Sequence, residues 1–229
     1  MEAYGVSEAV SLDVTGVARP RTALVCRVLD VLIAAVLLAL LLPLFVAVAL
    51  AIRLDSPGPM LYRQLRVGVG MRRFTLHKFR TMRPEADSQP HHDYVAGLIR
   101  GEAETVSRSH GSLYKLAHDE RITPVGRFLR RWSLDELPQL FNVLRGEMSL
   151  VGPRPAIPYE LDHYERSWYR RFSVKPGLTG LWQVSGRNEL TFHDMVRLDI
   201  EYAETWSFRL NVLILAKTPW VVIRGRGAV

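Results

Sequence analysis

The sequence predicts an α+β fold that is mainly helical, with one long apolar helix near the N-terminus followed by a small β-hairpin. The helix is indicated by an uncharged run of mostly Leu, Val and Ala from Val31 to Ile52. The hairpin is indicated by extended runs over 60–67 and 73–82, which flank the turn sequence Gly68-Val69-Gly70. With 229 residues, of which 48% are hydrophobic, the chain can bury a sizeable core, which excludes global disorder.

The chain is basic, and arginine carries nearly all of the excess. Its formal net charge is +7, and its only lysines are Lys78, Lys115, Lys175 and Lys217. Because a guanidinium binds planar oxyanions through two donors, this composition favours phosphate-bearing partners or an anionic lipid surface. The base composition of the coding sequence, which can favour arginine, explains most of this excess of arginine equally well. The single cysteine, Cys26, excludes disulfides within the chain and fits a reducing compartment.

The apolar run is long enough for a membrane helix, because a bilayer core takes about 20 apolar residues in helical form. A buried helix of a soluble protein and a signal peptide are the alternatives. Acidic residues precede the run, and it exceeds the usual apolar length of a signal peptide. Arginines flank it on both sides, at Arg19, Arg21 and Arg27 before it and at Arg53, Arg63, Arg66 and Arg72 after it.

The two basic flanks and a proline bear on whether this helix crosses the membrane or turns back within it. Arginine marks the cytoplasmic flank of a span, so two basic flanks favour a helix that enters and leaves through one face. Pro43, in the middle of the run, predicts a kink. Kinked helices also cross membranes, so the residues leave a re-entrant and a crossing helix both open. Arg27 and Asp30 lie three residues apart and are expected to pair near the headgroups.

We expect three regions along the chain. Residues 1–20 form a flexible tail, residues 21–55 form the membrane helix kinked near Pro43, and residues 56–229 form the remaining domain. In that domain the sequence predicts a solvated insert over 84–120, helices over 121–132, 133–145, 191–205 and 206–224, an aromatic core stripe over 158–172 and a glycine-rich loop over 175–188. The 121–132 and 206–224 helices are typical of membrane-interface helices, although the first could equally cap a core.

The acidic pair Asp135-Glu136 is the leading candidate for chemistry. Ser133 and Glu136 have the spacing of a capping box, so a purely structural role at a helix N-terminus is one interpretation. The other is catalytic, because such a terminus gathers phosphate and keeps a carboxylate ionised, and an ionised carboxylate can attack phosphorus. The neighbouring carboxylate could then hold Mg²⁺, which neutralises the charge of the phosphate under attack.

Several cations are candidate phosphate ligands. Arg154 lies between two prolines, which reduces the freedom that it loses on binding. Arg187 lies in a loop suited to closing on a ligand. Lys78 and Arg80 alternate with Phe79 and so face one side of an extended run. Taken singly, each of these residues also fits a surface turn, a solvated loop or an ordinary strand.

Five groups of motifs occur in a fixed order within residues 24–218: Lys78–Met82, Arg121–Thr123 with Val125–Arg130, Ser133–Leu140, Asn142–Leu144 with Met148–Pro155, and Lys175–Asn188. Together they resemble the bacterial sugar transferases, the monotopic polyprenyl-phosphate phosphoglycosyl transferases. Several long motifs in order are far more specific than any single one.

The resemblance implies an undecaprenyl-phosphate sugar phosphotransferase, which begins the assembly of a surface glycan such as an exopolysaccharide, a capsule or an O-antigen. Its substrates would be a UDP-sugar and a polyprenyl phosphate. Asp135 would be the nucleophile that takes the phosphosugar and releases UMP, and Glu136 would bind Mg²⁺. The other site residues implied are Arg154 as a phosphate ligand, and Lys78, Arg187 and Asp199 in or near the active site.

The same resemblance implies a re-entrant helix broken near Pro43 and a catalytic domain on the cytoplasmic face of the bacterial inner membrane. Partners would be the two substrates and membrane lipid, and apolar interfacial helices would allow a homodimer. Nucleic acid is not expected as a partner, because the sequence holds no motif for it. Two rival interpretations stay open: a direct single-displacement transferase in which Asp135 only binds metal, and a membrane-anchored adaptor without turnover.

Overall fold

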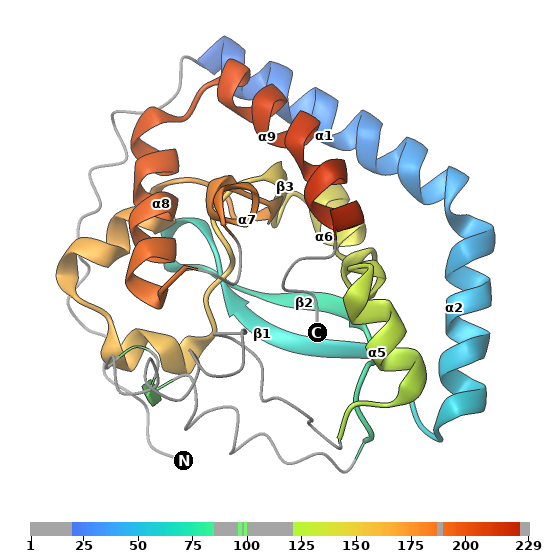
Figure 1. The fold of residues 1–229 in the computed structure, drawn as a ribbon. Coiled ribbons are helices and arrows are strands. Elements are labelled where there is room, and N and C mark those ends of the chain that lie inside the picture. Colours follow the sequence, from blue (N-terminus) through green and yellow to red (C-terminus); the bar gives the residue numbers. More distant parts are fainter. Residues whose placement is uncertain (1–19, 85–95, 98, 100–120, 187–189, 225–229) are drawn as a thin grey trace.

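The computed structural model describes residues 20–84, 96–97, 99, 121–186 and 190–224 (Figure 1). The predicted tail, apart from Pro20, nearly all of the 84–120 insert and Arg187 therefore lie outside the described residues. The α-helices are α1 (Pro20–Leu40), α2 (Leu42–Asp55), α5 (Pro124–Arg131), α6 (Gln139–Arg145), α7 (Leu181–Ser185), α8 (Phe192–Thr205) and α9 (Phe208–Arg224). The 3-10 helices are η2 (Val69–Met71), η3 (Leu134–Glu136), η4 (Pro158–His163) and η5 (Arg166–Ser173). The strands are β1 (Leu61–Val67), β2 (Arg73–Phe79), β3 (Ser149–Val151) and β4 (Gly177–Thr179).

The long apolar segment forms two helices that meet at a bend, as the position of Pro43 predicts. Leu41 separates α1 from α2 with φ −89° and ψ 2°, and Pro43 lies in the first turn of α2. Figure 1 shows the chain changing direction between the two helices. Among the described residues, α1 is the one helix long and apolar enough to cross a membrane. The kink is therefore confirmed, whereas re-entry into the membrane stays a prediction.

Both helices, together with α9, leave many large apolar side chains exposed. On α1 and α2 these are Leu24, Val25, Val28, Leu32, Ile33, Val36, Leu40, Leu42, Val46, Leu50 and Leu54. On α9 they are Phe208, Val212, Leu213, Trp220 and Ile223. The two surfaces adjoin, since α1 and α9 run alongside each other (Figure 1) and share one buried cluster through Ala34 and Ile214. An exposed apolar surface of this extent is typical of a membrane or protein interface.

The polar residues of α1 do not pair with each other as expected. Arg27 donates to the carbonyl oxygens of Val143 (2.6 Å) and Leu144 (2.9 Å) at the end of α6. A carboxylate oxygen of Asp30 accepts from the backbone N–H of Leu150 in β3, at 3.1 Å. Both side chains thus fix α1 to the domain that follows it, because unpaired backbone groups at a helix end and in a buried strand offer better partners than a surface ion pair.

We expect Asp30→Ala to destabilise the protein by about 1–3 kcal/mol, because the buried N–H of Leu150 loses its acceptor. Asp30→Asn keeps an acceptor oxygen and is the matched control, with a smaller expected loss. Thermal unfolding of the detergent-solubilised protein measures both. Equal unfolding temperatures for the two variants would show that this hydrogen bond does not hold α1 in place.

The hairpin forms as predicted. Strands β1 and β2 pair antiparallel, and the Gly68–Gly70 turn is confirmed, with Gly70 at φ 60°. The register places Tyr62 opposite Lys78. Since side chains alternate along a strand, the polar side chains of β1 at Tyr62, Gln64 and Arg66 share one face with Lys78.

Helix α6 packs on the hairpin through its apolar side chains and one buried amide. Leu140 and Val143 join Phe74 and Leu76 of β2 in the largest core cluster. Asn142, fully buried, donates to the carbonyl of Thr75 (2.7 Å) and accepts from the N–H of His77 (3.2 Å). These backbone contacts set α6, and with it the turn that precedes it, against β2.

The predicted loop over 175–188 is wrong for much of its length, because it contains β4 and α7. Strand β4 pairs parallel with β3, and the two backbones approach closely. A Cβ on Gly177 would lie 2.0 Å from the backbone nitrogen of Gly152, and one on Gly180 would lie 2.3 Å from the Gly152 carbonyl oxygen. The glycines here therefore serve close backbone packing rather than loop flexibility.

The remaining helical predictions hold with adjustments. Thr191 caps α8 by accepting from the N–H of Asp194 at 3.1 Å, and α9 covers most of the predicted 206–224 helix. The aromatic stripe over 158–172 is core, with Trp168 and Phe172 buried, although its backbone forms the two 3-10 helices η4 and η5. In α5, Leu129 is buried whereas Phe128 is exposed, so the helix both covers core and presents an apolar side chain outward.

Candidate active site

The acidic pair lies in a short turn with an unusual backbone. Asp135 and Glu136 are part of η3, and Ser133 before it has φ 54°, a left-handed conformation that is uncommon for a residue with a side chain. The predicted capping box does not form, since Ser133 makes no capping hydrogen bond from its side chain. The left-handed backbone and Pro138 delay the start of α6 to Gln139, so the pair lies one turn before the α-helix rather than at its first residue.

This turn rests on the helix predicted to be in the membrane. Leu134 and Leu137, on either side of the acidic pair, pack against a cluster that includes Val48 and Ile52 of α2. The neighbouring Phe45 of α2 also contacts Phe79, whose ring centroid lies 5.3 Å away, and Phe141, at 6.3 Å. Helix α2 therefore touches the acidic turn, the strand that ends beside it and the helix that follows it.

Lys78 and Glu136 are brought together by the fold. The Lys78 ammonium and the Glu136 carboxylate lie 2.8 Å apart, and both side chains are partly exposed, at 24% and 37%. They come from β2 and η3, 58 residues apart in the sequence. A partly exposed pair of this kind adds little to stability but fixes the direction of the Glu136 carboxylate.

Arg66 extends this site along β1. Its guanidinium donates to the side-chain oxygen of Gln64 (2.6 Å) and to the carbonyl of Pro155 (2.8 Å), so it reaches the Pro153-Arg154-Pro155 motif. Burial and the neighbouring Arg154 charge together lower the pKa of Arg66 to about 10, although Glu160 and Glu136 act in the opposite direction. The charge of Arg66 thus interacts with both Glu136 of the acidic turn and Arg154 of the Pro-Arg-Pro motif.

Behind the motif lies a buried ionic cluster made of Arg66, Arg154, Glu160, Tyr164, Arg171 and Asp199. Arg154 pairs with Glu160 at 2.9 Å, and Arg171 pairs with Asp199. Burial would raise the pKa of Glu160, but the neighbouring Arg154 and Arg66 guanidinium groups hold it below its usual value. Burial raises the pKa of Asp199 to about 6 despite the opposing charges of Arg171 and Arg154.

The predicted site residues are thus only partly assembled. Lys78 and Glu136 meet, and Asp135 adjoins them in the sequence. Arg154 and Asp199 belong to the buried cluster, in which Asp199 is 1% exposed and acts on Arg154 through Arg171.

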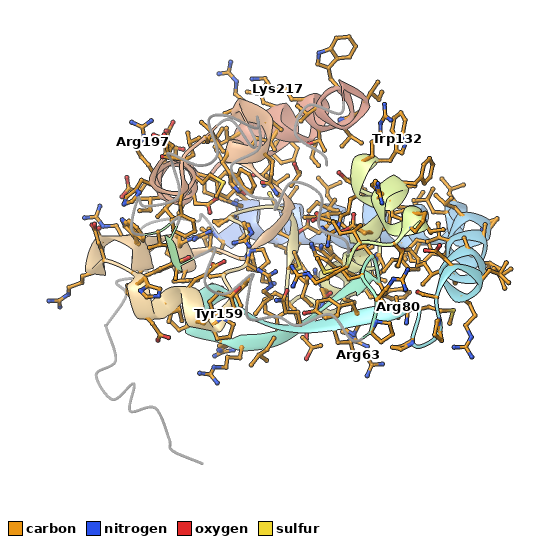
Figure 2. All side chains as sticks on the ribbon, turned by 60° about the horizontal axis from the view of Figure 1, so that its bottom comes forward. Arg63, Arg80, Trp132, Tyr159, Arg197 and Lys217 are labelled. Carbon is orange, nitrogen blue, oxygen red and sulfur yellow. The ribbon has the colours of Figure 1, made fainter. Side chains whose placement is uncertain are left out.

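Arg80 needs a correction. It is 5% exposed and donates to the carbonyls of Pro57 and Ser56, both at 2.7 Å, rather than facing a ligand. The alternation that predicted a shared face with Lys78 fails because β2 ends at Phe79. Arg80 instead ties the end of β2 to the turn after α2; Figure 2 labels its position beside the hairpin.

Sequence reasoning missed Arg66, Glu160 and Arg171. Arg66 was detectable, because the antiparallel register of the predicted hairpin places every second residue of β1 on the Lys78 face. Glu160 and Arg171 carry no such signal, since their partners lie on 3-10 helices and distant segments. Figure 2 shows Tyr159, the neighbour of Glu160, on the same side of the molecule as the hairpin residue Arg63, whereas Trp132 and Lys217 lie toward the opposite side.

The carboxylates of this site could hold Mg²⁺ only together with oxygen atoms of the substrate. Among the described residues, no three His, Cys, Asp or Glu side chains come together. Mg²⁺ is commonly held by one or two carboxylates together with substrate phosphates and water, and the adjacent carboxylates of Asp135 and Glu136 fit that arrangement. Arg154, Arg66 and Lys78 carry positive charge of the kind that binds phosphate.

Known proteins are similar to this chain over most of its length. Residues 21–225 match the family model for bacterial sugar transferases. The exopolysaccharide production protein ExoY of Rhizobium meliloti (strain 1021) is 38% identical over 214 residues, which cover 93% of this chain and 92% of that protein. The UDP-glucose:undecaprenyl-phosphate glucose-1-phosphate transferase of Caulobacter vibrioides is 43% identical over 200 residues, 84% of this chain and 67% of that protein.

Other relatives are much longer than this chain. The galactosyl transferase CpsE of Streptococcus agalactiae serotype III is 43% identical over 178 residues, which are 77% of this chain but 37% of that protein. The match therefore spans well under half of CpsE and nearly all of ExoY. The family model covers most of the chain and includes every described residue of the site. The predicted resemblance is confirmed: the chain is an enzyme of the bacterial sugar transferase family.

Proposed function

We propose that this enzyme transfers a sugar-1-phosphate from a UDP-sugar to undecaprenyl phosphate, releasing UMP, at the start of exopolysaccharide or capsule synthesis. The observation that carries the proposal is the placement of the Asp135-Glu136 turn between the basic Lys78 side of the hairpin and the apolar helix α2. A donor diphosphate suits the first surface, and a lipid acceptor suits the second. The relative from Caulobacter, whose name specifies UDP-glucose and undecaprenyl phosphate, supports the same classes of substrate.

The chemistry that we propose proceeds in two displacements at one phosphorus atom. A carboxylate oxygen of Asp135 attacks the phosphorus that bears the sugar, and the bond from that phosphorus to the oxygen of UMP breaks, so UMP leaves with the electron pair. A phosphate oxygen of the lipid acceptor then attacks the same phosphorus, and the bond to Asp135 breaks. The carboxylate is regenerated, and the sugar is joined to the lipid through a diphosphate.

The neighbouring groups make the first displacement feasible. Attack by one anion on another requires positive charge at the phosphates. Arg154 binds the donor diphosphate, and Lys78 holds Glu136 in the direction that its 2.8 Å ion pair fixes. A Mg²⁺ ion held by Glu136 and substrate oxygens would supply Lewis-acid neutralisation of the diphosphate.

The location that we propose is the cytoplasmic face of the inner membrane, with α1 and α2 forming a re-entrant hairpin. The exposed apolar side chains of both helices support membrane burial, and the contact of η3 with α2 keeps the acidic turn near the lipid boundary. A polyprenyl phosphate carries its phosphate at headgroup depth, so a site held there meets its acceptor without extracting it.

Release of UMP by the membrane-bound protein tests this function. The assay supplies Mg²⁺ and each of a panel of UDP-sugars, with and without undecaprenyl phosphate. With at least one donor we expect continuous UMP release in the presence of the acceptor and about one UMP per chain in its absence. An enzyme that turns over none of them would refute the proposed substrates. A single-displacement enzyme would release UMP only with acceptor present, and an adaptor would support glycan assembly even with Asp135→Asn.

We expect Lys78→Met to lower kcat by roughly ten- to a hundred-fold while changing stability by less than about 1 kcal/mol, because the partly exposed pair orients Glu136 more than it stabilises the fold. Arg170→Met, which breaks the well-exposed pair of Arg170 with Glu204, is the matched control and should leave kcat unchanged. UMP release and thermal unfolding give the two measurements. A kcat for Lys78→Met equal to that of the control would exclude this role.

A further inference from the structure

We propose that Glu160 is a positioning residue that aims the Arg154 guanidinium at the donor diphosphate. The inference rests on the proposed function and adds to it a residue that never touches substrate. Glu160 belongs to η4, and its side chain is 1% exposed. It lies six residues after Arg154, beyond the second proline of the Pro-Arg-Pro motif.

Glu160 is itself held by several donors, so its carboxylate is a fixed point. One oxygen accepts from Arg154 at 2.9 Å. The other accepts from the backbone N–H of Ile157 at 3.1 Å and from the Tyr164 hydroxyl at 3.3 Å. A carboxylate held in this way can direct a guanidinium through a short charge-assisted hydrogen bond.

The backbone of Arg154 is fixed independently of its side chain. Arg171 donates to the Arg154 carbonyl oxygen at 2.9 Å, and Asp199 in turn binds Arg171. Arg66 donates to the carbonyl of the next residue, Pro155, at 2.8 Å. With the backbone held on both sides by prolines and arginines, the Glu160 contact is what selects the direction of the side chain.

One edge of Arg154 faces outward. Its side chain is 28% exposed, and among the described residues Glu160 alone accepts from its guanidinium, through Nη1. The other donors are therefore available to an anion. The cluster places three guanidinium groups, of Arg66, Arg154 and Arg171, against the two carboxylates of Glu160 and Asp199. Its surplus positive charge attracts an anion to that exposed edge.

The test compares Glu160→Gln, Arg154→Gln and the double variant by UMP release in membranes over a range of UDP-sugar concentrations. We expect Glu160→Gln to raise the KM for UDP-sugar roughly ten- to a hundred-fold with kcat changed less than about threefold. In the double variant the Glu160 change should add nothing to the effect of Arg154→Gln, because one residue acts through the other. A merely structural loss would lower the amount of active enzyme and leave KM unchanged.

Glu204→Gln is the control, because it alters a carboxylate whose arginine pair is exposed, and its KM should match the wild type. Where Glu160→Gln does not fold, Glu160→Asp keeps the charge but shortens the reach to Arg154, and it should raise KM by a smaller factor. Unchanged KM in a folded Glu160 variant, or full additivity in the double variant, overturns the inference. A wild type that shows no turnover overturns the proposed function instead.

Discussion

Asp135→Asn should lower kcat at least about a thousand-fold and leave the protein folded. An amide nitrogen or oxygen does not replace an ionised carboxylate as a nucleophile toward phosphorus, so the loss should appear in the chemical step rather than in KM. The fold should survive because Leu134 and Leu137, on either side of the acidic pair, pack on the α2 cluster and hold the turn. Single-turnover UMP release and thermal unfolding measure the two effects.

Asp162→Asn is the matched control, since Asp162 is an exposed acid in another 3-10 helix, η4. It should retain wild-type kcat. If Asp135→Asn instead kept more than about a tenth of the wild-type kcat, Asp135 would not be the nucleophile, and the single-displacement alternative would gain support.

Arg171→Met should cost about 3–5 kcal/mol of stability, because it leaves the Asp199 carboxylate buried without its partner. For a chain of this length the loss corresponds to a fall of roughly 6–20 °C in Tm. Arg170→Met is the control, because Arg170 is the adjacent residue and its ion pair is well exposed, so its Tm should hardly change. Thermal unfolding in a single detergent compares the three proteins.

The stability deficit of Arg171→Met should also depend on pH. Burial raises the pKa of Asp199 to about 6, above its unfolded value of about 3.9. The folded protein then keeps a proton that the unfolded chain has lost, so the contribution of Asp199 to stability falls as pH rises from about 4 to about 6. Without Arg171 the pKa of Asp199 rises further. The stability that Arg171→Met loses relative to the wild type should therefore be smaller at pH 5 than at pH 7.5. An equal deficit at both values would contradict the buried pair as its cause.

Local signals predicted the elements whose sequence and structure agree over several residues. The Gly68–Gly70 turn between extended runs predicted the hairpin, Pro43 predicted the bend between α1 and α2, and the helix predicted over 191–205 corresponds to α8. The acidic pair was found because two neighbouring carboxylates before an apolar helix are chemically distinctive. The ion pair between Glu136 and Lys78 was not predictable in this way, because the two residues belong to separate elements that only the fold brings together.

What the sequence did not predict depends on contacts between distant segments. The glycines within residues 175–188 predicted a loop, and only the paired strands show that Gly177 serves close backbone approach to Gly152. The left-handed conformation of Ser133 arises where α5 meets η3, and the conformational preferences of serine do not predict it. Arg80 was predicted to face a ligand and Arg171 carried no signal, but the fold buries both against acceptors far along the chain.

Mass spectrometry of the intact wild-type protein tests the covalent role of Asp135 most directly. The protein is incubated with Mg²⁺ and its UDP-sugar in the absence of polyprenyl phosphate and then quenched under conditions that preserve an acyl phosphate. We predict one phosphosugar per chain, mapped to the peptide that contains Asp135, together with an equal amount of UMP and loss of the adduct once undecaprenyl phosphate is added. If the protein releases UMP only when the acceptor is present and never carries the adduct, Asp135 is not a covalent nucleophile.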